Sequence, residues 1–377
     1  MRVCIIRNAD GEMNAQMERV ATALAEAGHD FFYVTRARNT DLNQRVVEKE
    51  LEVGNMTVRN FEIQLPAVRG GGLKNLKPLY QYGRILEKWL LENEALYDTI
   101  HAIDYDAGSV AARIAQKKDK KFVYHIADFY ADSRLGIPSQ LRLLIAQWER
   151  KLIGKADATI VCSEDRIQQI KGSHPKEVVV VHNTPARQQV IKQEDIPKVI
   201  KEKLVLTYVG GIEKKRFIDQ AVEVVAKQPN IQLLLAGDGD ATEKVLAVSS
   251  KHENIKYYGR VAYQEALALY ADTDLMFAMY DPSHPNHKYS AANKVYEAQL
   301  MGKAIIVAKG TGMDKIVADN NMGYVIDYNQ AAFSAVLEHI IANQGELYEK
   351  RVNALLAYPK YSWDEMKQRI ITPYDKL

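Results

Sequence analysis

The chain has 377 residues, of which 47% are hydrophobic and 26% are charged, and its formal net charge at pH 7 is +2. A chain of this length is longer than one hydrophobic core usually organises, which favours two domains. The composition excludes a chain that is mainly disordered. The nearly balanced charge excludes the strong basic field that would by itself indicate a nucleic-acid partner.

The cysteine content and the lack of long apolar segments indicate the compartment. Cys4 and Cys162 lie far apart, each inside an apolar run, so we expect buried free thiols rather than a disulfide framework or a zinc site. The first seven residues hold too short an apolar stretch for a signal peptide, and no later segment approaches the ~20 apolar residues of a membrane span. The sequence therefore predicts a cytoplasmic protein.

The first half of the chain alternates short apolar runs with helix-length amphipathic stretches. Residues 3–6 and 31–34 are predicted as buried strands, joined by a helix over residues 14–27 that ends at Gly28. Further strands are predicted at residues 99–103, 122–126, 159–162 and 178–181, with helices between them that include residues 107–116 and 140–153. Continuous rather than alternating apolar strands indicate a parallel sheet that helices cover on both faces.

A polar stretch between Thr184 and Lys203, with Pro185 and Pro197, interrupts this rhythm and is predicted to be a linker. The rhythm then restarts, with six strands predicted at residues 204–209, 233–236, 255–258, 275–278, 304–307 and 324–326. We therefore expect two doubly wound, Rossmann-like α/β domains, over residues 1–190 and 200–358. Such sheets bind ligands beyond the carboxyl ends of their strands, so the site is expected to face a cleft between the domains.

The first candidate site follows the strand predicted at residues 204–209. There Gly210 and Gly211 are followed by Lys214, Lys215 and Arg216 at the start of a helix. Glycines let the backbone approach an anion, a helix start favours negative charge, and Arg216 offers a forked donor for a phosphate. A glycine turn before a solvated basic helix end is the alternative, and for this motif taken alone it is the better interpretation.

The second candidate site is the run Asn293-Lys294-Val295-Tyr296-Glu297-Ala298, which opens a predicted helix. Lys294 and Glu297 stand three residues apart, so they share a helix face with Cβ atoms ~5–6 Å apart. A cation for a diphosphate and a carboxylate for a ribose diol are what a nucleotide-sugar site needs at that reach. The alternative is a surface ion pair that contributes ~0–1 kcal/mol, but the position in a strand-to-helix loop favours a binding role.

The second half resembles the donor domain of glycosyltransferase family 4, which has the GT-B fold of two facing Rossmann-like domains. Matching segments, in order, are Tyr208-Val209-Gly210-Gly211-Ile212, Leu235-Ala236-Gly237-Asp238-Gly239, Tyr258-Gly259-Arg260-Val261 and the run from Asn293 through Gly302 to Ala308. In the first half Gly28-His29, His101-Ala102-Ile103-Asp104, Ser163-Glu164 and His182-Asn183 are similar to the same family. Each motif is weak alone, but their ordered series covers nearly the whole chain.

The resemblance implies a hexosyltransferase-type enzyme that retains the anomeric configuration and needs neither a metal nor another cofactor. It implies that Arg216 and Lys294 contact the diphosphate of the donor, Glu297 the ribose hydroxyls, and the backbone near Val261 the base. Such cations stabilise the departing diphosphate in place of a metal. Gly211, Tyr289 and Asn293 complete the expected donor-binding residues.

Three positions depart from the family pattern. Many members carry a glutamate eight positions before the one that matches Glu297, where this chain has Tyr289, and Gly211 replaces the usual arginine after the first glycine. The selectivity for the donor sugar is therefore open. A histidine common near the end of the fourth-strand region corresponds to Ala127, which leaves His125 and Asp128 as the two candidates for the catalytic residue on the acceptor side.

Two Asp-x-Asp patterns, at residues 104–106 and 238–240, are of the kind that can hold a metal-bound diphosphate. Both follow predicted strands and precede helices, where aspartate is a common cap, so we expect two helix caps and no metal site.

Two further segments indicate partners and domain packing. Residues 69–80 mix basic and apolar side chains without acidic ones, which suits either a loop that contacts the membrane surface or an ordinary solvated loop. Residues 361–377 resemble the final segment of the family, and we expect this end to form a helix that packs back on the N-terminal domain. A helix packed only on its own domain is the alternative.

Taken together, the sequence predicts a glycosyltransferase that moves a sugar from a nucleotide diphospho-sugar to a glycan, a glycolipid or a small molecule, as in polysaccharide biosynthesis. The expected partners are the donor and a sugar or lipid-linked acceptor, with peripheral contact to the inner face of the membrane as an open alternative and no nucleic acid. A nucleotide-sugar epimerase of the same architecture and a non-catalytic nucleotide- or glycan-binding protein are the competing hypotheses.

Overall fold

The computed structural model describes residues 1–11, 14–38, 40, 45–67, 72–133, 137–186, 189–199 and 202–377. The chain divides into two compact units, of which the first comprises Met1–His182 and Trp363–Leu377 and the second Asn183–Ser362. The stretch predicted as a linker thus belongs to the second unit, where the Ile191 amide donates to the Leu300 carbonyl over 3.3 Å. The boundary falls after residue 182 rather than near residue 190 because these residues pack on the second unit.

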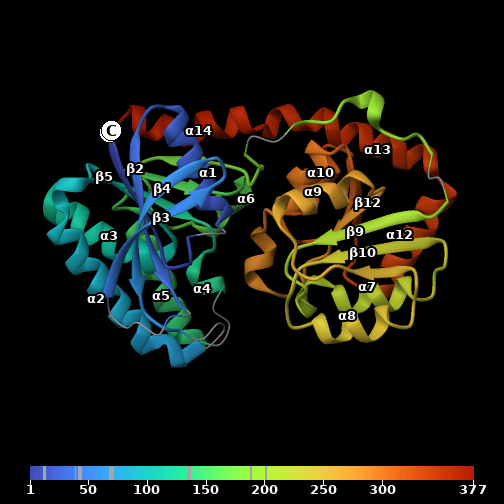
Figure 1. The fold of residues 1–377 in the computed structure, drawn as a ribbon, viewed down its shortest axis with the longest axis horizontal. Helices are drawn as coiled ribbons and strands as arrows, with labels where there is room; N and C mark the ends of the chain where they lie inside the picture. The colour runs from blue at the N-terminus through green and yellow to red at the C-terminus, as the bar shows by residue number, and fades with distance from the viewer. Residues whose placement is uncertain are drawn as a thin grey trace. The chain divides into compact units, whose positions relative to one another are not determined.

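An eight-stranded sheet in the order β3-β4-β2-β1-β5-β6-β7-β8 forms the centre of the first unit (Figure 1). Its strands are β1 (Arg2–Arg7), β2 (Asp30–Ala37), β3 (Arg45–Val53), β4 (Met56–Gln64), β5 (Thr99–Ile103), β6 (Lys121–Ile126), β7 (Ala158–Val161) and β8 (Val178–Val180). Its helices are α1 (Ala15–Glu26), α2 (Leu76–Glu92), α3 (Asp104–Lys118), α4 (Tyr130–Ser133), α5 (Ser139–Ile153), α6 (Glu164–Gln169) and α14 (Trp363–Asp375), with 3-10 turns η1 (Gly72–Asn75) and η2 (Glu94–Leu96).

The strands β3 and β4 form a hairpin that the sequence prediction missed. β4 is parallel to β2, whereas β3 is antiparallel to β4 and lies at the edge of the sheet. Its charged side chains face solvent or pair across the hairpin, as Glu48 does with Arg59 at 2.6 Å. An exposed edge strand carries charges rather than an apolar run because this discourages pairing with other chains. The apolar pattern of a buried parallel strand is therefore absent from it.

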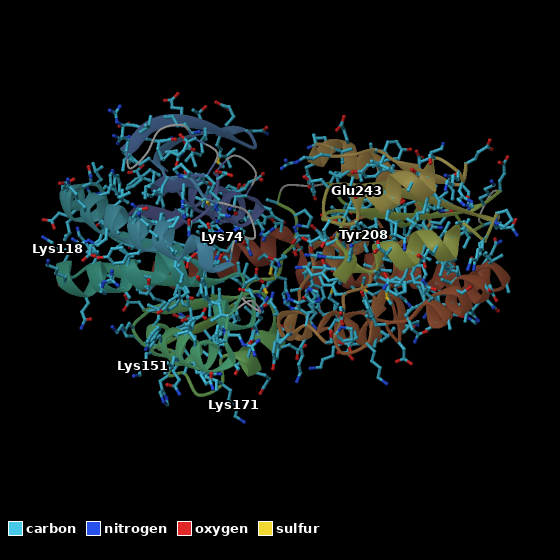
Figure 2. All side chains as sticks on the ribbon, turned by 90° about the horizontal axis from the view of Figure 1, so that it is seen from below. Lys74, Lys118, Lys151, Lys171, Tyr208 and Glu243 are labelled. Atoms are coloured by element: carbon cyan, nitrogen blue, oxygen red, sulfur yellow. The ribbon has the colours of Figure 1, made fainter. Side chains whose placement is uncertain are left out.

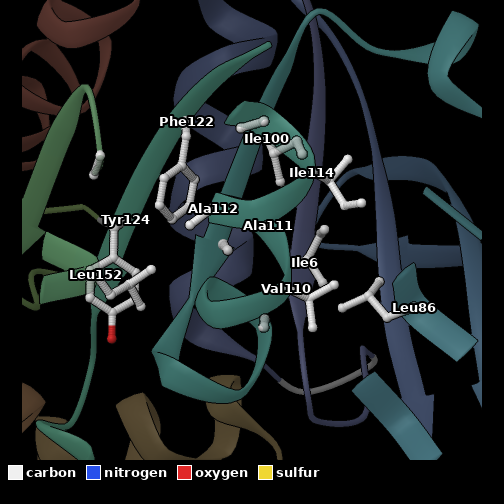
Figure 3. Close-up of a cluster of buried hydrophobic side chains, with 14 of the residues drawn as sticks. Ile6, Leu86, Ile100, Val110, Ala111, Ala112, Ile114, Phe122, Tyr124 and Leu152 are labelled. Carbon is white, nitrogen blue, oxygen red and sulfur yellow. The ribbon is translucent and has the colours of Figure 1, made fainter. Parts of the chain in front are cut away.

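The core of the first unit lies between the sheet and the helices that cover it, and Figure 3 shows part of it. Ile6, Ile100 and Phe122 from three neighbouring strands pack against Val110 and other residues of α3. The close approach of α3 to the sheet depends on Gly108, since a Cβ atom there would lie 2.6 Å from the Tyr124 ring. A glycine inside this helix therefore serves packing, not flexibility.

The last helix of the chain, α14, packs on the first unit. Its Met366 and Ile370 are buried, and the His182 amide lies 3.0 Å from the Met366 sulfur. Arg369 donates to the Val180 carbonyl of β8 over 3.2 Å, and Lys367 pairs with a glutamate of α1. The chain thus passes from one unit to the other at residues 182–183 and again at residues 362–363.

The second unit contains a six-stranded, fully parallel sheet in the order β11-β10-β9-β12-β13-β14. Its strands are β9 (Leu204–Val209), β10 (Ile231–Ala236), β11 (Ile255–Tyr257), β12 (Leu275–Ala278), β13 (Ala304–Ala308) and β14 (Gly323–Ile326). Its helices are α7 (Ile218–Val225), α8 (Thr242–Ser249), α9 (Tyr263–Ala271), α10 (Asn293–Leu300), α11 (Met313–Asp319), α12 (Gln330–Ala342) and α13 (Gln344–Ala357). Short 3-10 turns are η3 (Gln193–Asp195), η4 (Lys214–Arg216), η5 (Pro285–Tyr289) and η6 (Tyr358–Tyr361).

Both faces of this second sheet are buried at its central strands, which accounts for the continuous apolar sequences of β12 and β13. Along β12, Leu275 and Phe277 join the core formed with α7, α8 and α12. Met276 and Ala278 point to the opposite face and join a second core with residues of α9, α10 and α11. The two doubly wound α/β units confirm the predicted fold class, with the single antiparallel strand β3 as an addition.

The sequence also predicted that no segment spans a membrane and that both cysteines are buried free thiols. No helix among the residues that the structure describes is both long and apolar enough to cross a bilayer. Cys4 and Cys162 are both buried and carry free thiols.

Candidate functional site

The strand order of the second sheet reverses between β9 and β12, and in doubly wound sheets such a switch point opens a crevice at the carboxyl ends of the strands. The glycine loop Gly210-Gly211 follows β9 and leads into η4. The loop that follows β12 leads into α10. The Asp281 amide donates to the Lys215 carbonyl over 3.0 Å, so the segment after β12 is held against η4.

The glycine loop is held by the segment that follows β10. The Gly210 amide donates to the Ala236 carbonyl and the Ile212 amide to the Asp238 carbonyl, over 2.9 and 2.8 Å. A Cβ atom on Gly237, whose φ is +130°, would lie 1.8 Å from the Gly210 carbonyl oxygen. Only glycine fits at this contact, so Gly237 maintains the shape of the glycine loop.

Lys294 is buried beside this loop, which excludes the surface ion pair that the sequence left open. Its Nζ atom lies 4.2 Å from the centroid of the Tyr208 ring, a cation–π contact (Figure 2 labels Tyr208). A Cβ atom on Gly210 would stand 2.7 Å from Nζ, so the glycine makes room for the lysine. Burial, and then the charge of Arg216, lower the pKa of Lys294 to about 7. The neutral amine form of Lys294 is thus available near pH 7 to take up a proton when an anion binds.

Arg216 ends η4 with its guanidinium against Tyr280. The guanidinium carbon lies 4.1 Å from the centroid of the Tyr280 ring, and Nη1 donates to the hydroxyl of the same side chain. Nε donates to a carboxylate oxygen of Glu213 over 3.2 Å, and Lys215 pairs with that carboxylate at 3.5 Å. These contacts orient the forked donor that phosphate recognition requires. Sequence reasoning missed Glu213, although its position three residues before Arg216 is a usable signal.

Glu297 lies buried one helical turn after Lys294 on α10. Its Oε2 accepts a hydrogen bond of 3.0 Å from the Tyr270 hydroxyl of α9. The Glu297 carboxylate is close enough to Lys294 to raise the pKa of that lysine, against the larger effect of burial. The Tyr208 hydroxyl donates to the Gly211 carbonyl over 2.9 Å, so one aromatic side chain links the glycine loop to α10.

The structure therefore brings Arg216, Lys294 and Glu297 into one group with Tyr208, which we call the cation cluster. Asn293 is exposed at the first position of α10, and Gly211 is half-buried beside Glu213. The other predicted donor residues are half-buried in separate loops, Tyr289 at the end of η5 and Val261 between β11 and α9.

Neither Asp-x-Asp pattern caps its own helix, which corrects the expectation of two helix caps. Asp240 accepts a hydrogen bond of 2.9 Å from the amide of Lys214, at the start of η4. Asp104 pairs with Arg7 at 3.2 Å, and its other oxygen accepts from the amides of Ala127 and Asp128. Asp104 and Asp240 instead join their turns to other segments of the same unit. Among the described residues no group of three or more His, Cys, Asp or Glu side chains is arranged to hold a metal ion.

The two acceptor-side candidates, His125 and Asp128, differ in exposure. His125 is buried, with Nδ1 3.2 Å from Nε2 of His101, whose Nδ1 in turn lies 2.5 Å from the Tyr374 hydroxyl of α14. Burial lowers the pKa of His101 to about 3 and holds that of His125 well below its usual value, so both rings are neutral at pH 7. Asp128 is exposed and pairs with Arg166 at 3.3 Å. Of the two, only Asp128 presents its side chain at the surface.

Two protein-family models match the chain, one in each half. Residues 11–184 match the Glycosyl transferase 4-like domain, and residues 190–355 match Glycosyl transferases group 1. The glycogen synthase of Mycobacterium tuberculosis is 22% identical over 83% of this chain and 78% of its own length. The D-inositol 3-phosphate glycosyltransferase of Gordonia bronchialis is 21% identical over 97% of this chain and 84% of its own.

Solved structures share the fold along the whole chain. A sucrose-phosphate synthase from Thermosynechococcus elongatus superposes with a TM-score of 0.75 at 16% identity, covering 100% of this chain and 98% of its own. The Anabaena protein HepE in complex with UDP-glucose superposes with a TM-score of 0.68 at 15% identity, covering 100% of both chains.

Proposed function

We propose that this chain, which belongs to the glycosyl transferases group 1 family and has the GT-B fold, takes its sugar from a nucleotide diphospho-sugar and retains the anomeric configuration. The cation cluster in the second unit carries this proposal. It joins two cationic side chains and a buried carboxylate at the switch point of a parallel sheet, where such folds bind their ligands. The HepE structure with UDP-glucose supports a donor of this class.

Each side chain of the cluster has a role that its surroundings favour. The guanidinium of Arg216, oriented by Glu213 and Tyr280, binds two oxygens of the diphosphate. Lys294 takes up a proton as the anion approaches and neutralises the charge that grows on the diphosphate when the bond to the sugar breaks. Glu297, held by Tyr270, accepts hydrogen bonds from the ribose hydroxyls.

Metal-independent catalysis is part of the proposal. Arg216 and Lys294 supply the positive charge that a divalent cation supplies in other phosphate-transferring sites. The carboxylates of Asp104 and Asp240 already accept hydrogen bonds from backbone amides, which favours a structural role for both patterns.

The acceptor binds, in this proposal, on the first unit near the exposed carboxylate of Asp128. A glycan, a glycolipid and a small molecule are the acceptor classes under consideration, and the names of the relatives, which refer to glycogen, inositol phosphate and sucrose phosphate, favour no single class. A lipid-linked acceptor would bring the chain to a membrane surface. In the basic segment at residues 69–80, Leu76 and Tyr80 are exposed, whereas residues 68–71 lie outside the described residues.

Donor binding is the decisive test. We expect one nucleoside diphosphate and its sugar conjugate to raise the unfolding temperature of the protein by mass action, and the double variant Arg216→Ala/Lys294→Ala to lose this response. Lys256→Ala, an exposed lysine of β11 in the same unit, is the matched control. Wild-type donor affinity in the folded double variant would refute the site.

Product analysis separates the competing functions. Transfer to an added acceptor, with retained configuration seen by NMR, supports the proposal, whereas epimerised nucleotide sugar without an acceptor indicates an epimerase. Donor binding without turnover, across soluble and lipid-linked acceptors, indicates a binding protein.

A further inference from the structure

The helix α5 of the first unit exposes an unusual number of large apolar side chains. Leu141, Leu143, Leu144 and Trp148 have exposed fractions of 37, 65, 46 and 49%. Leu141, Leu144 and Trp148 are spaced three and four residues apart, so they form one stripe along the helix. The adjoining face of α5, with Ile145 and Leu152 among others, is buried in the core of the first unit. The apolar face of α5 therefore extends beyond the core, and its outer part is exposed.

The charges that α5 presents to solvent are all positive. Arg142, Arg150 and Lys151 are half-buried or exposed, and Lys155 follows the helix directly (Figure 2 labels Lys151). The helix has a single acidic residue, Glu149, and its side chain is fully buried. An apolar stripe that contains a tryptophan and is bordered by basic side chains has the composition that binds the interface of an anionic bilayer.

We propose that α5 docks the first unit on the surface of a membrane that contains anionic phospholipids. Trp148 and the leucines insert between the headgroups while Arg142 and Lys151 lie among the phosphates. A second copy of this chain suits the surface less well. In a two-fold symmetric contact the same helix meets itself, which would place these basic side chains opposite one another.

Glu149 connects this surface to the acceptor-side candidate. One carboxylate oxygen accepts from the Tyr124 hydroxyl of β6 and the other from the Tyr130 amide, both over 2.8 Å. The bonds hold α5 against the segment that contains Asp128, two residues before Tyr130. Docking through α5 would thus place the Asp128 segment near the bilayer. This position would serve catalysis if the chain is the proposed transferase and its acceptor is lipid-linked, so that benefit rests on the proposed function.

Trp148 offers a direct readout of docking. The chain contains three tryptophans, and the other two, Trp89 and Trp363, are each only 7% exposed. We expect vesicles of phosphatidylcholine and phosphatidylglycerol to shift the tryptophan emission of the wild-type protein to shorter wavelength, and Trp148→Phe to remove the shift. Vesicles of phosphatidylcholine alone should bind far more weakly, and added salt should weaken binding to the mixed vesicles.

Sedimentation with the same vesicles measures the apolar contribution. The triple variant Leu143→Ser/Leu144→Ser/Trp148→Ser should bind at least ~30-fold more weakly, because each side chain contributes through its buried apolar area. Leu356→Ser on α13 is the matched control, since Leu356 is 64% exposed and lies in the second unit. Circular dichroism and the unfolding midpoint establish that each variant is folded. Vesicle binding needs no nucleotide sugar, so it tests docking separately from the transferase proposal.

Four outcomes would overturn the proposal. These are wild-type protein that does not bind the mixed vesicles, a folded triple variant that binds them like wild type, and equal binding to neutral and anionic vesicles. The fourth is a wild-type dimer that the triple variant converts to a monomer without lipid, which would identify a second copy as the occupant. In the second of these outcomes, loss of binding in Leu76→Ser/Tyr80→Ser would identify α2 as the docking surface instead.

Discussion

Replacing Lys294 by methionine would test the buried ammonium at the centre of the cation cluster. Methionine keeps an unbranched side chain of similar length and removes the charge. Burial and the charge of Arg216 lower the pKa of Lys294 from 10.5 to about 7 in the folded protein. At 1.36 kcal/mol for each pKa unit, the protein disfavours the protonated form by about 5 kcal/mol relative to the unfolded chain.

The sign of the pH dependence follows from this difference. Between pH 7 and about pH 10 the unfolded chain binds more protons at this site than the folded protein, so stability rises with pH in that window. The site lowers the free energy of unfolding by about 4 kcal/mol at pH 7 and by about 2 kcal/mol at pH 9. We therefore expect Lys294→Met to be more stable than wild type at pH 7, by an amount that falls by about 2 kcal/mol at pH 9.

Urea unfolding of both proteins at pH 7 and pH 9 measures these differences, and titrating groups that do not interact with Lys294 cancel in the comparison. Calorimetry with a nucleoside diphosphate above pH 7, in buffers of different ionisation enthalpy, should show proton uptake by wild type and none by the variant. The affinity of the variant should be at least ~100-fold lower, since a charge-assisted contact in a buried site is lost. A variant that is less stable at pH 7, has the same pH profile and binds the ligand normally would refute this reasoning.

Four other predictions concern the site and the fold. Glu297→Ala should lower kcat/KM for the donor by at least ~10-fold in a folded protein and Tyr270→Phe by less, because the phenol only positions the carboxylate; equal, wild-type kinetics in both would contradict the ribose role. Activity should survive excess EDTA, and a loss that Mg²⁺ or Mn²⁺ restores would disprove metal independence. Gly237→Ala should destabilise the protein by at least ~3 kcal/mol, as its methyl group would clash with the Gly210 carbonyl; an unchanged urea midpoint would contradict this. A chain that ends before Trp363 should unfold at lower temperature and bind a hydrophobic dye, because the buried face of α14 no longer covers α1 and β8; wild-type melting would argue against it.

Strand positions were readable from the sequence wherever both faces of a strand are buried. In the second unit β12 and β13 are continuous apolar runs because helices cover both sides of the sheet there. The hairpin of β3 and β4 was not predicted, since charged residues such as Glu48 in β3 and Arg59 in β4 interrupt the continuous apolar run by which the other strands were recognised. The extent of the second unit also required the structure, because proline and charge mark a break in the pattern but do not show that Ile191 packs beside α10.

The sequence alone was enough to select the residues of the candidate site. The glycine loop with Arg216, and the pair Lys294 and Glu297, each follow a predicted strand and precede or open a helix. Only the tertiary structure decided how these groups differ from the surface residues they resemble. The side chains that surround them, Tyr208, Tyr270 and Tyr280, come from other elements of the same unit. Likewise, His125 and Asp128 are equivalent candidates in the sequence, and packing against His101 buries one while the other remains exposed. The pKa of a lysine and the exposure of a carboxylate depend on desolvation and on charges nearby in space, and folding sets both by joining segments that are distant along the chain.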